Sequence, residues 1–539
     1  MFVSTLLTIL FHIAFISKIN AQSTWKPSFY PEYCSEDGTL NDISSENRAI
    51  PPLSTTELNM IEELKQVQVM IRHGARTPYA KLSCWKDYDI DWNNCKPTEL
   101  VLPSPSRTSN ERMAPWLFRK LYDAFPDLLG GNCYTGQLIL EGFNQEAELG
   151  NLFRDTYTPY QDGVSYDPKL HVMEDTNWAT VEENNLTYFR STDLQRTLMS
   201  GQVFVYNLFN VSENDEDIVS WHTGDNSIDN LSPSNGACPY LATIEDNAYD
   251  NDTFIVNNAT ITGDLNGFLT AQLGTPGTDW EWSQITDCFM TTICTEREIP
   301  NPLVDQGQPG WTDELFNQTI NADQYAYFWK MKFNNSEWSR LGMSDIVYNV
   351  HKNAENMQNS VLYNNFSFVL YSAHDTSVIP FVDALLPPGQ TIDFWAPYAS
   401  YVSVEMYEAT AATTASTGET HYFRVIYNGQ VLQPNGCSNT GLCKGSEFMT
   451  TTIGWGESLG GDTCQQTTTS ADTNDDPSTT DCHNNKNDVE MDSGLFAGVI
   501  ILSILFGAGM AGVVFKYQYW DDMVGRGGLS NRIPKSDEV

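Results

Sequence analysis

The chain has 539 residues, of which 41% are hydrophobic and 12% aromatic, a composition typical of a globular enzyme or ectodomain and not of a disordered chain. Its formal net charge is −40 and no basic run is present, which excludes nucleic acid as a partner because a phosphate backbone is bound by a basic face. A site for a small phosphate-bearing substrate would need arginines gathered locally to reverse this negative field.

Residues 1–21 predict a secretory signal peptide. The apolar stretch from Phe2 to Ile16 is followed by polar residues and the small Ala21, where cleavage is expected. No Lys or Arg precedes the apolar stretch, so an uncleaved signal anchor is the alternative. Residues 22–60 are then an N-terminal extension.

Residues 61–204 are interpreted as the first part of an α/β core. Residues 64–71 (LKQVQVMI) predict a buried strand that stops at RHGARTP, residues 72–78. Helical spacing follows in residues 141–157 and again in 193–207.

The Asn-rich segment 205–345 is interpreted as an inserted, mainly helical cap. The core resumes over 346–459, where 366–371 (FSFVLY) predict a second buried strand that stops at SAHD.

Residues 401–407 and 422–427 alternate as strands, and the tract 409–420 between them is predicted to be a loop. Strands that alternate with helices favour a layered α/β sheet with helices on both faces. In such sheets, sites form at the carboxyl ends of the strands.

The C-terminal part predicts a membrane anchor. A Thr/Asp-rich stalk (460–493) precedes a 22-residue apolar run without charge from Gly494 to Phe515, long enough to cross a bilayer. Basic residues in the tail 516–539 place that end in the cytosol. We therefore expect a single-pass type I membrane protein of the secretory pathway, at the cell surface or in endolysosomes, with its catalytic domain lumenal or extracellular. Small residues spaced four apart in the run leave a homodimer open.

All 11 cysteines lie between the leader and the membrane run. In an oxidising compartment most are expected to form disulfides, and an odd number leaves at least one free or paired with another chain. The same region holds eight Asn-x-Ser/Thr sequons, which predict a glycoprotein. The sequons are Asn185, Asn210, Asn230, Asn251, Asn258, Asn317, Asn334 and Asn365.

The residues that could carry out catalysis follow the ends of the two predicted buried strands. Arg72, His73 and Arg76 follow the first strand, so two guanidinium forks and one imidazole converge where a tetrahedral oxyanion would bind. A neutral imidazole can attack phosphorus, and the flanking charge lowers its pKa. His374 and Asp375 follow the second strand. Taken singly, these features also suit a structural His-Gly turn and a helix cap.

Three segments in order resemble the histidine acid phosphatase family, which includes prostatic and lysosomal acid phosphatases and phytases: RHGARTP, the stretch 190–201 (RSTDLQRTLMSG) and 372–378 (SAHDTSV). The resemblance covers roughly residues 60–465. It implies that the family's further phosphate-binding arginine is Arg196, which alone could pair with Asp193 on a helix surface. Arg190 is better interpreted as structural.

By this resemblance His73 is phosphorylated, Asp375 protonates the leaving group, and the phosphoryl oxygens are held by Arg72, Arg76, Arg196 and His374. Residues 138–142 (LILEG) depart from the family's segment, which leaves the local pocket wall open. The loop with Cys437 and Cys443 resembles the family's short disulfide loop, and Cys464 is expected to reach back to the cap.

No metal or cofactor is expected, because no His-x-x-x-His, Cys-x-x-Cys or carboxylate cluster accompanies RHGARTP. The leading hypothesis is an acid phosphatase for small phosphate monoesters that acts through a phosphohistidine. Lysophosphatidate, phosphosugars and inositol phosphates all remain open as substrates. The alternative is a catalytically idle ectodomain that binds phosphorylated ligands or serves as a receptor.

Overall fold

The computed structural model describes most of residues 23–464. Its gaps are residue 30, 32–33, 35–47, 80–83, 87, 89, 96–128, 160–167, 174–177, 179–180, 182–183, 185, 210–218, 264, 275–281, 360–364, 388–389, 391–394 and 451–462. The predicted signal peptide, most of the stalk, the membrane run 494–515 and the tail lie outside the described residues. Within the described part, no helix is both long and apolar enough to cross a bilayer.

The core is a mixed sheet of eight described strands in the order β11-β10-β9-β2-β8-β5-β6, with β12 beside β10. The neighbours β2, β8, β5 and β6 run parallel, and the remaining pairs are antiparallel. Their bounds are β2 Ile61–Arg72, β5 Thr187–Ser191, β6 His222–Thr223, β8 Phe368–Ala373, β9 Tyr401–Ala409, β10 His421–Tyr427, β11 Gln430–Leu432 and β12 Cys443–Lys444.

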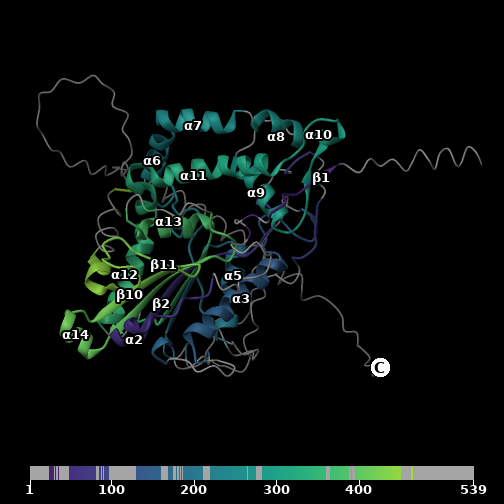
Figure 1. The fold of residues 1–539 in the computed structure, drawn as a ribbon. Helices are drawn as coiled ribbons and strands as arrows, with labels where there is room; N and C mark the ends of the chain where they lie inside the picture. Colours follow the sequence, from purple (N-terminus) through teal and green to yellow (C-terminus); the bar gives the residue numbers. More distant parts are fainter. Residues whose placement is uncertain are drawn as a thin grey trace, which may run out of the picture. The chain divides into compact units, whose positions relative to one another are not determined.

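Helices cover both faces of this sheet (Figure 1). On one face lie α3 (Leu140–Tyr157) and α5 (Gln195–Phe209), and on the other lie α12 (Ser344–Gln358) and α13 (Asp375–Leu385). Each presents one apolar stripe: Leu149, Phe153 and Tyr157 recur every four residues on α3 and are buried. Each such side chain contributes about 1.5–3 kcal/mol when removed from water. The expected layered α/β core is confirmed.

A helical layer lies beyond the sheet's carboxyl edge (Figure 1). Its helices are α6 Tyr240–Tyr249, α7 Asp252–Thr262, α8 Leu265–Leu273, α9 Trp282–Ile293, α10 Pro302–Asp305 and α11 Asp313–Gly342. We call this layer the cap. The backbone of α11 leaves helical values over residues 333–336. The predicted cap boundary at residue 205 falls inside α5, and β6 still belongs to the main sheet, so the cap helices begin only at Tyr240.

Short elements complete the described fold. The strand β1 (Thr24–Trp25) pairs with β7 (Ile299–Pro300) of the cap, and β3 (Asp91–Trp92) pairs with β4 (Gly130–Gly131). The helix α2 (Thr55–Met60) precedes β2, and a short 3₁₀ turn spans Pro168–Leu170.

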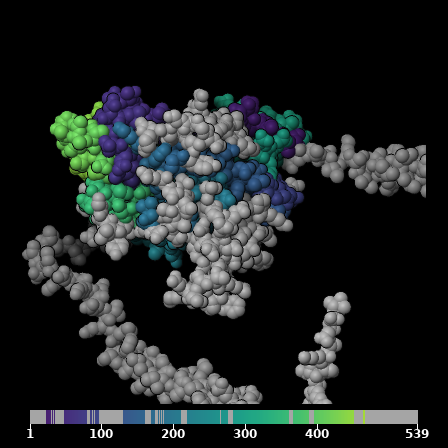
Figure 2. Space-filling view, turned by 90° about the horizontal axis from the view of Figure 1, so that it is seen from below, coloured from purple at the N-terminus to yellow at the C-terminus, as the bar shows by residue number. Residues whose placement is uncertain are grey.

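The tract 409–420 was predicted to be a loop, and this was wrong. It contains the helix α14 (Ala411–Thr417), which begins where the Thr410 hydroxyl accepts a hydrogen bond from the Thr413 N–H and ends at Gly418 in the left-handed region. Figure 2 shows α14 in light green beside the purple segment that carries α2, and the Thr410 N–H donates to the Met60 carbonyl at 2.9 Å.

Five disulfides pair ten of the 11 cysteines, and the eleventh, Cys482, lies outside the described residues. The expected Cys437–Cys443 loop is confirmed, and Cys464 does reach back to the cap region, at Cys238. The other pairs are Cys34–Cys294, Cys84–Cys288 and Cys95–Cys133. Cys84–Cys288 joins α9 to the segment that follows the RHGARTP loop, and Cys34–Cys294 joins the residue after α9 to the N-terminal extension.

Candidate active site

The parallel strands β2 and β8 bring the two predicted chemical segments together. Arg72 lies opposite Ala373 in the register, so both strands end at the same edge of the sheet. The His73 N–H donates to the Ala373 carbonyl at 3.0 Å, and the ring centroids of His73 and His374 are 5.4 Å apart. The RHGARTP loop and the SAHD segment are therefore direct neighbours.

Two glycines allow the RHGARTP loop to lie against the start of α3. A Cβ atom on Gly74 would lie 2.2 Å from the carbonyl oxygen of Gly142, and one on Gly142 would lie 2.2 Å from that of Ala75. Only glycine fits at such an approach. The segment 138–142, whose departure from the family pattern left this wall open, thus retains the residue on which the close packing depends.

The imidazole of His73 is buried and held in one tautomer. Its Nδ1 lies 2.8 Å from the carbonyl oxygen of Gly74. A carbonyl only accepts, so Nδ1 carries the hydrogen and Nε2 carries the lone pair. Burial and the charges of Arg196 and Arg76 lower the pKa of His73 well below its ordinary value. The imidazole of His73 therefore stays neutral at acidic pH, with its lone pair on Nε2.

Three arginines surround this imidazole. Arg72 is the last residue of β2 and Arg76 lies in the loop that follows, and both are buried. Arg196 lies in the first turn of α5, where its Nη1 approaches the Gly136 carbonyl at 3.5 Å. Burial and the charge of Arg76 lower the pKa of Arg196 to about 9, so it stays charged at acidic and neutral pH. Within the described residues the buried Nε of Arg196 has no hydrogen-bond partner, which makes it a donor for an anion.

His374 and Asp375 begin the helix α13. His374 is its N-cap, and its Nε2 lies 3.0 Å from the Thr192 hydroxyl. Burial and the charge of Arg196 lower the pKa of His374 well below its ordinary value. The helix start adds a partial positive charge to the same space.

Asp375 is already paired in this structure. Its Oδ2 lies 2.9 Å from Arg72 Nη2 and accepts a hydrogen bond from the Trp395 indole at 2.8 Å. Burial alone would raise the pKa of Asp375, but Arg72 and Trp395 outweigh it and hold the pKa at about 2. The free site therefore holds an ionised carboxylate beside a neutral imidazole.

The cap contributes two further carboxylates that the sequence did not reveal. Asp287 on α9 lies 2.7 Å from Arg76 Nη1 and accepts a hydrogen bond from the Tyr79 N–H. Asp323 on α11 is close enough to Asp287 and Asp375 to be affected by their charges. Burial and these two like charges raise the pKa of Asp323 to about 6, against the opposing effects of Thr286 and Lys330. No motif marks either residue, and only their place in a helical insertion brings them to the site.

Aromatic rings support the arginines. The ring of Tyr398 lies against the Arg72 guanidinium, with 4.2 Å between Cζ and the ring centroid, and Tyr79 lies 5.4 Å from the Cζ of Arg76. The sequence signal that could have identified Trp395 and Tyr398 is the aromatic cluster in residues 394–398 (FWAPY). These rings fix the guanidinium planes without neutralising them.

Two further predictions concern Arg190 and metal binding. Arg190 is directed to Asp229, at 2.9 Å, and to Asn230, at 2.7 Å, which agrees with its structural interpretation. Among the described residues no group of His, Cys, Asp and Glu side chains is arranged to hold a metal ion.

Residues 63–428 match the model of the histidine phosphatase superfamily (branch 2). Counting factor 60 of Dictyostelium discoideum is 28% identical over 413 residues, which cover 74% of this chain and 87% of that protein. Lysophosphatidic acid phosphatase type 6 of Mus musculus is 23% identical, with 76% and 88% covered. The apo phytase of Hafnia alvei is similar in structure at a TM-score of 0.43 and 12% identity, over 75% of this chain and 98% of that one.

Proposed function

Because the chain belongs to the histidine phosphatase superfamily (branch 2), we propose that it is an acid phosphatase that hydrolyses small phosphate monoesters through a phosphohistidine at His73. One observation carries the proposal: a buried imidazole with its Nε2 lone pair free lies among three arginines. Guanidinium groups suit the tetrahedral oxyanion by their planar donors, and the neutral nitrogen between them is placed to attack phosphorus.

The reaction divides into two balanced steps. In the first, His73 Nε2 bonds to phosphorus while the bond from phosphorus to the ester oxygen breaks, and Asp375 gives a proton to the departing oxygen. In the second, water attacks the phosphohistidine, Asp375 takes a proton from that water, and the nitrogen–phosphorus bond breaks. Throughout, the phosphoryl oxygens are held by Arg72, Arg76, Arg196 and His374.

The proton that Asp375 delivers has to arrive with the substrate, because this carboxyl is ionised in the free site, with a pKa of about 2. A phosphate monoester loses its second proton near pH ~6, so at acidic pH it binds as a monoanion that still carries one proton. When the phosphoryl oxygens take the Arg72 donor that Asp375 occupies, the carboxylate loses that partner and gains an anionic neighbour. Both changes raise its proton affinity, and the proton moves from the phosphoryl group to Asp375.

We propose that the chemistry needs no metal ion. In this site the guanidinium groups and the start of α13 supply the positive charge that a divalent cation supplies elsewhere. The same arginines meet the requirement that a strongly acidic chain must reverse its field locally to bind phosphate.

The cap carboxylates favour a substrate with a single phosphate group. Three guanidinium charges are offset by Asp375 and Asp287, which leaves one net positive charge while Asp323 is protonated. A second or third phosphate group on the substrate would then lie near carboxylates and not near arginines. Among the open candidates, lysophosphatidate and phosphosugars therefore suit the site better than highly phosphorylated inositols.

The proposed activity is tested with the purified full chain and a substrate panel: p-nitrophenyl phosphate, lysophosphatidate, a sugar monophosphate and inositol hexakisphosphate, at pH 4 to 7 with and without EDTA. We expect turnover of the three monophosphates, poor turnover of inositol hexakisphosphate, and no loss with EDTA. Turnover no higher than that of a His73→Ala variant would contradict the enzyme proposal and favour the idle ectodomain.

The titration of Asp323 predicts part of the pH profile. Below its pKa of about 6 the carboxyl is neutral, and above that value it adds a negative charge that repels the substrate, so kcat/KM falls as pH rises through this value. Asp323→Asn removes the charge and is expected to raise kcat/KM at pH 7.5 by roughly three- to tenfold, with little effect at pH 4.5. The measurement is kcat/KM on p-nitrophenyl phosphate from pH 4 to 8.

The control for this profile is Asp246→Asn, an exposed aspartate on α6 of the cap. It removes the same charge at a distance from the site and is expected to leave the profile unchanged. Ionisation of the substrate is common to all three proteins and cancels in the comparison. Identical profiles for wild type and Asp323→Asn would show that Asp323 does not control binding.

We further propose that the enzyme works outside the cytosol, anchored by the run 494–515 with its catalytic domain lumenal or extracellular. The support is the apolar run with basic residues after it, the N-terminal leader, and a set of five disulfides that needs an oxidising compartment. Protease protection of the full chain in sealed microsomes tests this arrangement.

A further inference from the structure

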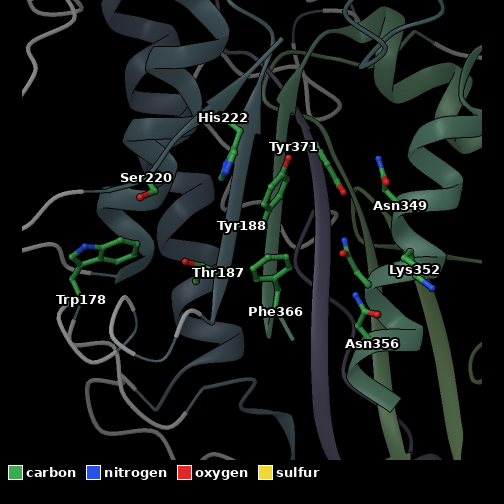
Figure 3. Close-up of a pocket in the computed structure, with 11 residues that line it drawn as sticks. Trp178, Thr187, Tyr188, Ser220, His222, Asn349, Lys352, Asn356, Phe366 and Tyr371 are labelled. Carbon is green, nitrogen blue, oxygen red and sulfur yellow. The ribbon is translucent and has the colours of Figure 1, made fainter. Parts of the chain in front are cut away.

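A pocket with a volume of about 490 Å³ opens on the sheet face that α12 covers, toward the edge strands β5 and β6 (Figure 3). None of the residues assigned to phosphate chemistry lines it. Its volume lies within the ~300–1,000 Å³ typical of small-molecule sites. We propose that this pocket binds a neutral carbohydrate, such as one unit of a glycan, and that it acts separately from the phosphatase site.

One wall of the pocket is aromatic. Figure 3 shows the rings of Tyr188, Phe366 and Tyr371 along this wall. Tyr188 packs 5.5 Å from Phe366 and 6.3 Å from Tyr371 between ring centroids, and His222 stacks on it at 4.4 Å. The rings therefore pack into one aromatic wall, in which Phe366 is tilted by 39° and Tyr371 by 61° to Tyr188. The C–H face of a sugar ring is the part of a hydroxyl-rich ligand that packs against such rings.

The opposite wall is a row of amides. Asn349, Asn353 and Asn356 follow one another at helical spacing on α12 and all line the pocket. Figure 3 shows the side chains of Asn349 and Asn356 on this wall. An amide both donates and accepts hydrogen bonds, as the hydroxyl groups of a sugar do, so the chemistry of this wall matches such a ligand.

The amide row is fixed from behind by buried glutamines. Asn353 Nδ2 donates to Gln68 Oε1 at 3.0 Å, and Gln68 Nε2 donates to the Val350 carbonyl at 2.8 Å. Gln66 donates in turn to the Phe366 carbonyl at 2.7 Å. Gln66 and Gln68 lie in the central strand β2, at 0% and 3% exposure, where apolar side chains would pack more simply. This network holds both walls at a fixed separation, as preorganised binding requires.

The charge of the lining favours a neutral ligand over an ionic one. The chain has 69 acidic residues, yet no Asp or Glu is among the described residues that line the pocket, so a cation would find no partner. Lys352 is paired with Glu355 at 2.7 Å, and His222 Nδ1 is bonded to the Phe189 carbonyl. An anion would also be repelled by the net charge of −40. The other side chains that line the pocket are aromatic rings, amides and hydroxyls. These groups favour a neutral ligand that is rich in hydroxyl groups.

Such a sugar has two possible sources. The sequon at Asn365 immediately precedes Phe366 of the aromatic wall, so a glycan of the chain itself would begin beside the pocket. The other source is a glycan or free sugar from another molecule. Both present the same neutral chemistry, and the experiment separates them.

The test is ligand-observed NMR titration of the full chain, and of its Asn365→Gln variant, with methyl α-mannoside, methyl β-N-acetylglucosaminide and methyl β-xyloside, in a detergent without a sugar headgroup. Binding to the wild type would support a sugar from another molecule. Binding only to Asn365→Gln would support occupation by the chain's own glycan. No binding to either protein would overturn the proposal.

Substitutions in the lining test whether a sugar binds in this pocket. Asn349→Ala/Asn356→Ala, made in whichever protein binds, is expected to weaken binding by roughly tenfold or more, since two hydrogen-bonding amides are lost. Tyr348→Ala is the matched control, because Tyr348 lies on the same helix, is exposed and does not line the pocket. Turnover of p-nitrophenyl phosphate should be unchanged in all variants. Unchanged sugar affinity in the double variant would also overturn the proposal.

Discussion

His73→Ala is expected to lower kcat/KM on p-nitrophenyl phosphate by about 10⁴-fold or more, because it removes the imidazole that we propose bonds to phosphorus and leaves the electrostatic binding of the arginines. The loss should be nearly the same on every substrate and at every pH. The measurement is kcat/KM across the substrate panel, together with quenching of a ³²P-labelled substrate in alkali, where phosphohistidine survives. Wild type should retain label on the protein, and the variant should not.

The control for this loss is His351→Ala. His351 is also a buried histidine, but it lies on α12 and away from the loop that carries His73. Its removal affects packing without touching the chemistry, so turnover per folded molecule should stay within a few-fold of wild type. A His73→Ala protein that folds normally and retains more than about a hundredth of the activity would show that another nucleophile operates.

Asp375→Asn is expected to separate substrates by their leaving groups. On an alkyl ester such as glycerol 2-phosphate the departing alkoxide needs a proton, and kcat should fall by about 10²–10⁴-fold, the usual contribution of a general acid. On p-nitrophenyl phosphate the leaving group is stable as an anion, so the first step should lose less than about tenfold. Because the amide cannot compete for Arg72 as a carboxylate does at 2.9 Å, KM should fall and not rise.

The matched control is Asp383→Asn on the same helix, α13. Asp383 is buried at 2% exposure, and burial raises its pKa to about 6 despite the hydroxyls of Ser339 and Ser336. It therefore reports what loss of a buried carboxylate does to the helix, with no contact to the phosphate. Equal losses on alkyl and aryl substrates in Asp375→Asn would point to a positioning role and not to proton transfer.

The sequence predicted the core of the site because its chemistry lies at strand ends. The strand 64–71 and its loop, and the strand 366–371 and its His374–Asp375 pair, needed only a parallel arrangement to meet, and β2 and β8 provide it. Arg196 could be assigned because it lies within a motif, although nothing in helical spacing distinguishes it from a surface arginine.

What could not be predicted depends on contacts between distant segments. Asp287 and Asp323 lie on helices with no motif, and they reach Arg76 and Asp375 only because the cap lies over the sheet edge. The pairing of the cysteines also joins segments that are distant in sequence, so it could not be predicted, apart from the short Cys437–Cys443 loop. The helix α14 was not predicted because its threonines and small residues are also typical of loops. Only its N-cap at Thr410 and its C-cap at Gly418 distinguish it from a loop.

The strand order has a consequence for how the protein is made. The central strand β2 is synthesised early, yet its partners on both sides, β8 and β9, begin only at residues 368 and 401. Until those residues emerge, the ribosome has produced a chain whose apolar strand β2 has no neighbour and whose Arg72 has no Asp375 to pair with. Such distant pairing is slow and exposes apolar surface. A phosphatase built this way stays inactive until at least the first 409 of its 539 residues have been made, about three quarters of the chain, and chaperones that shield its first half should govern its yield.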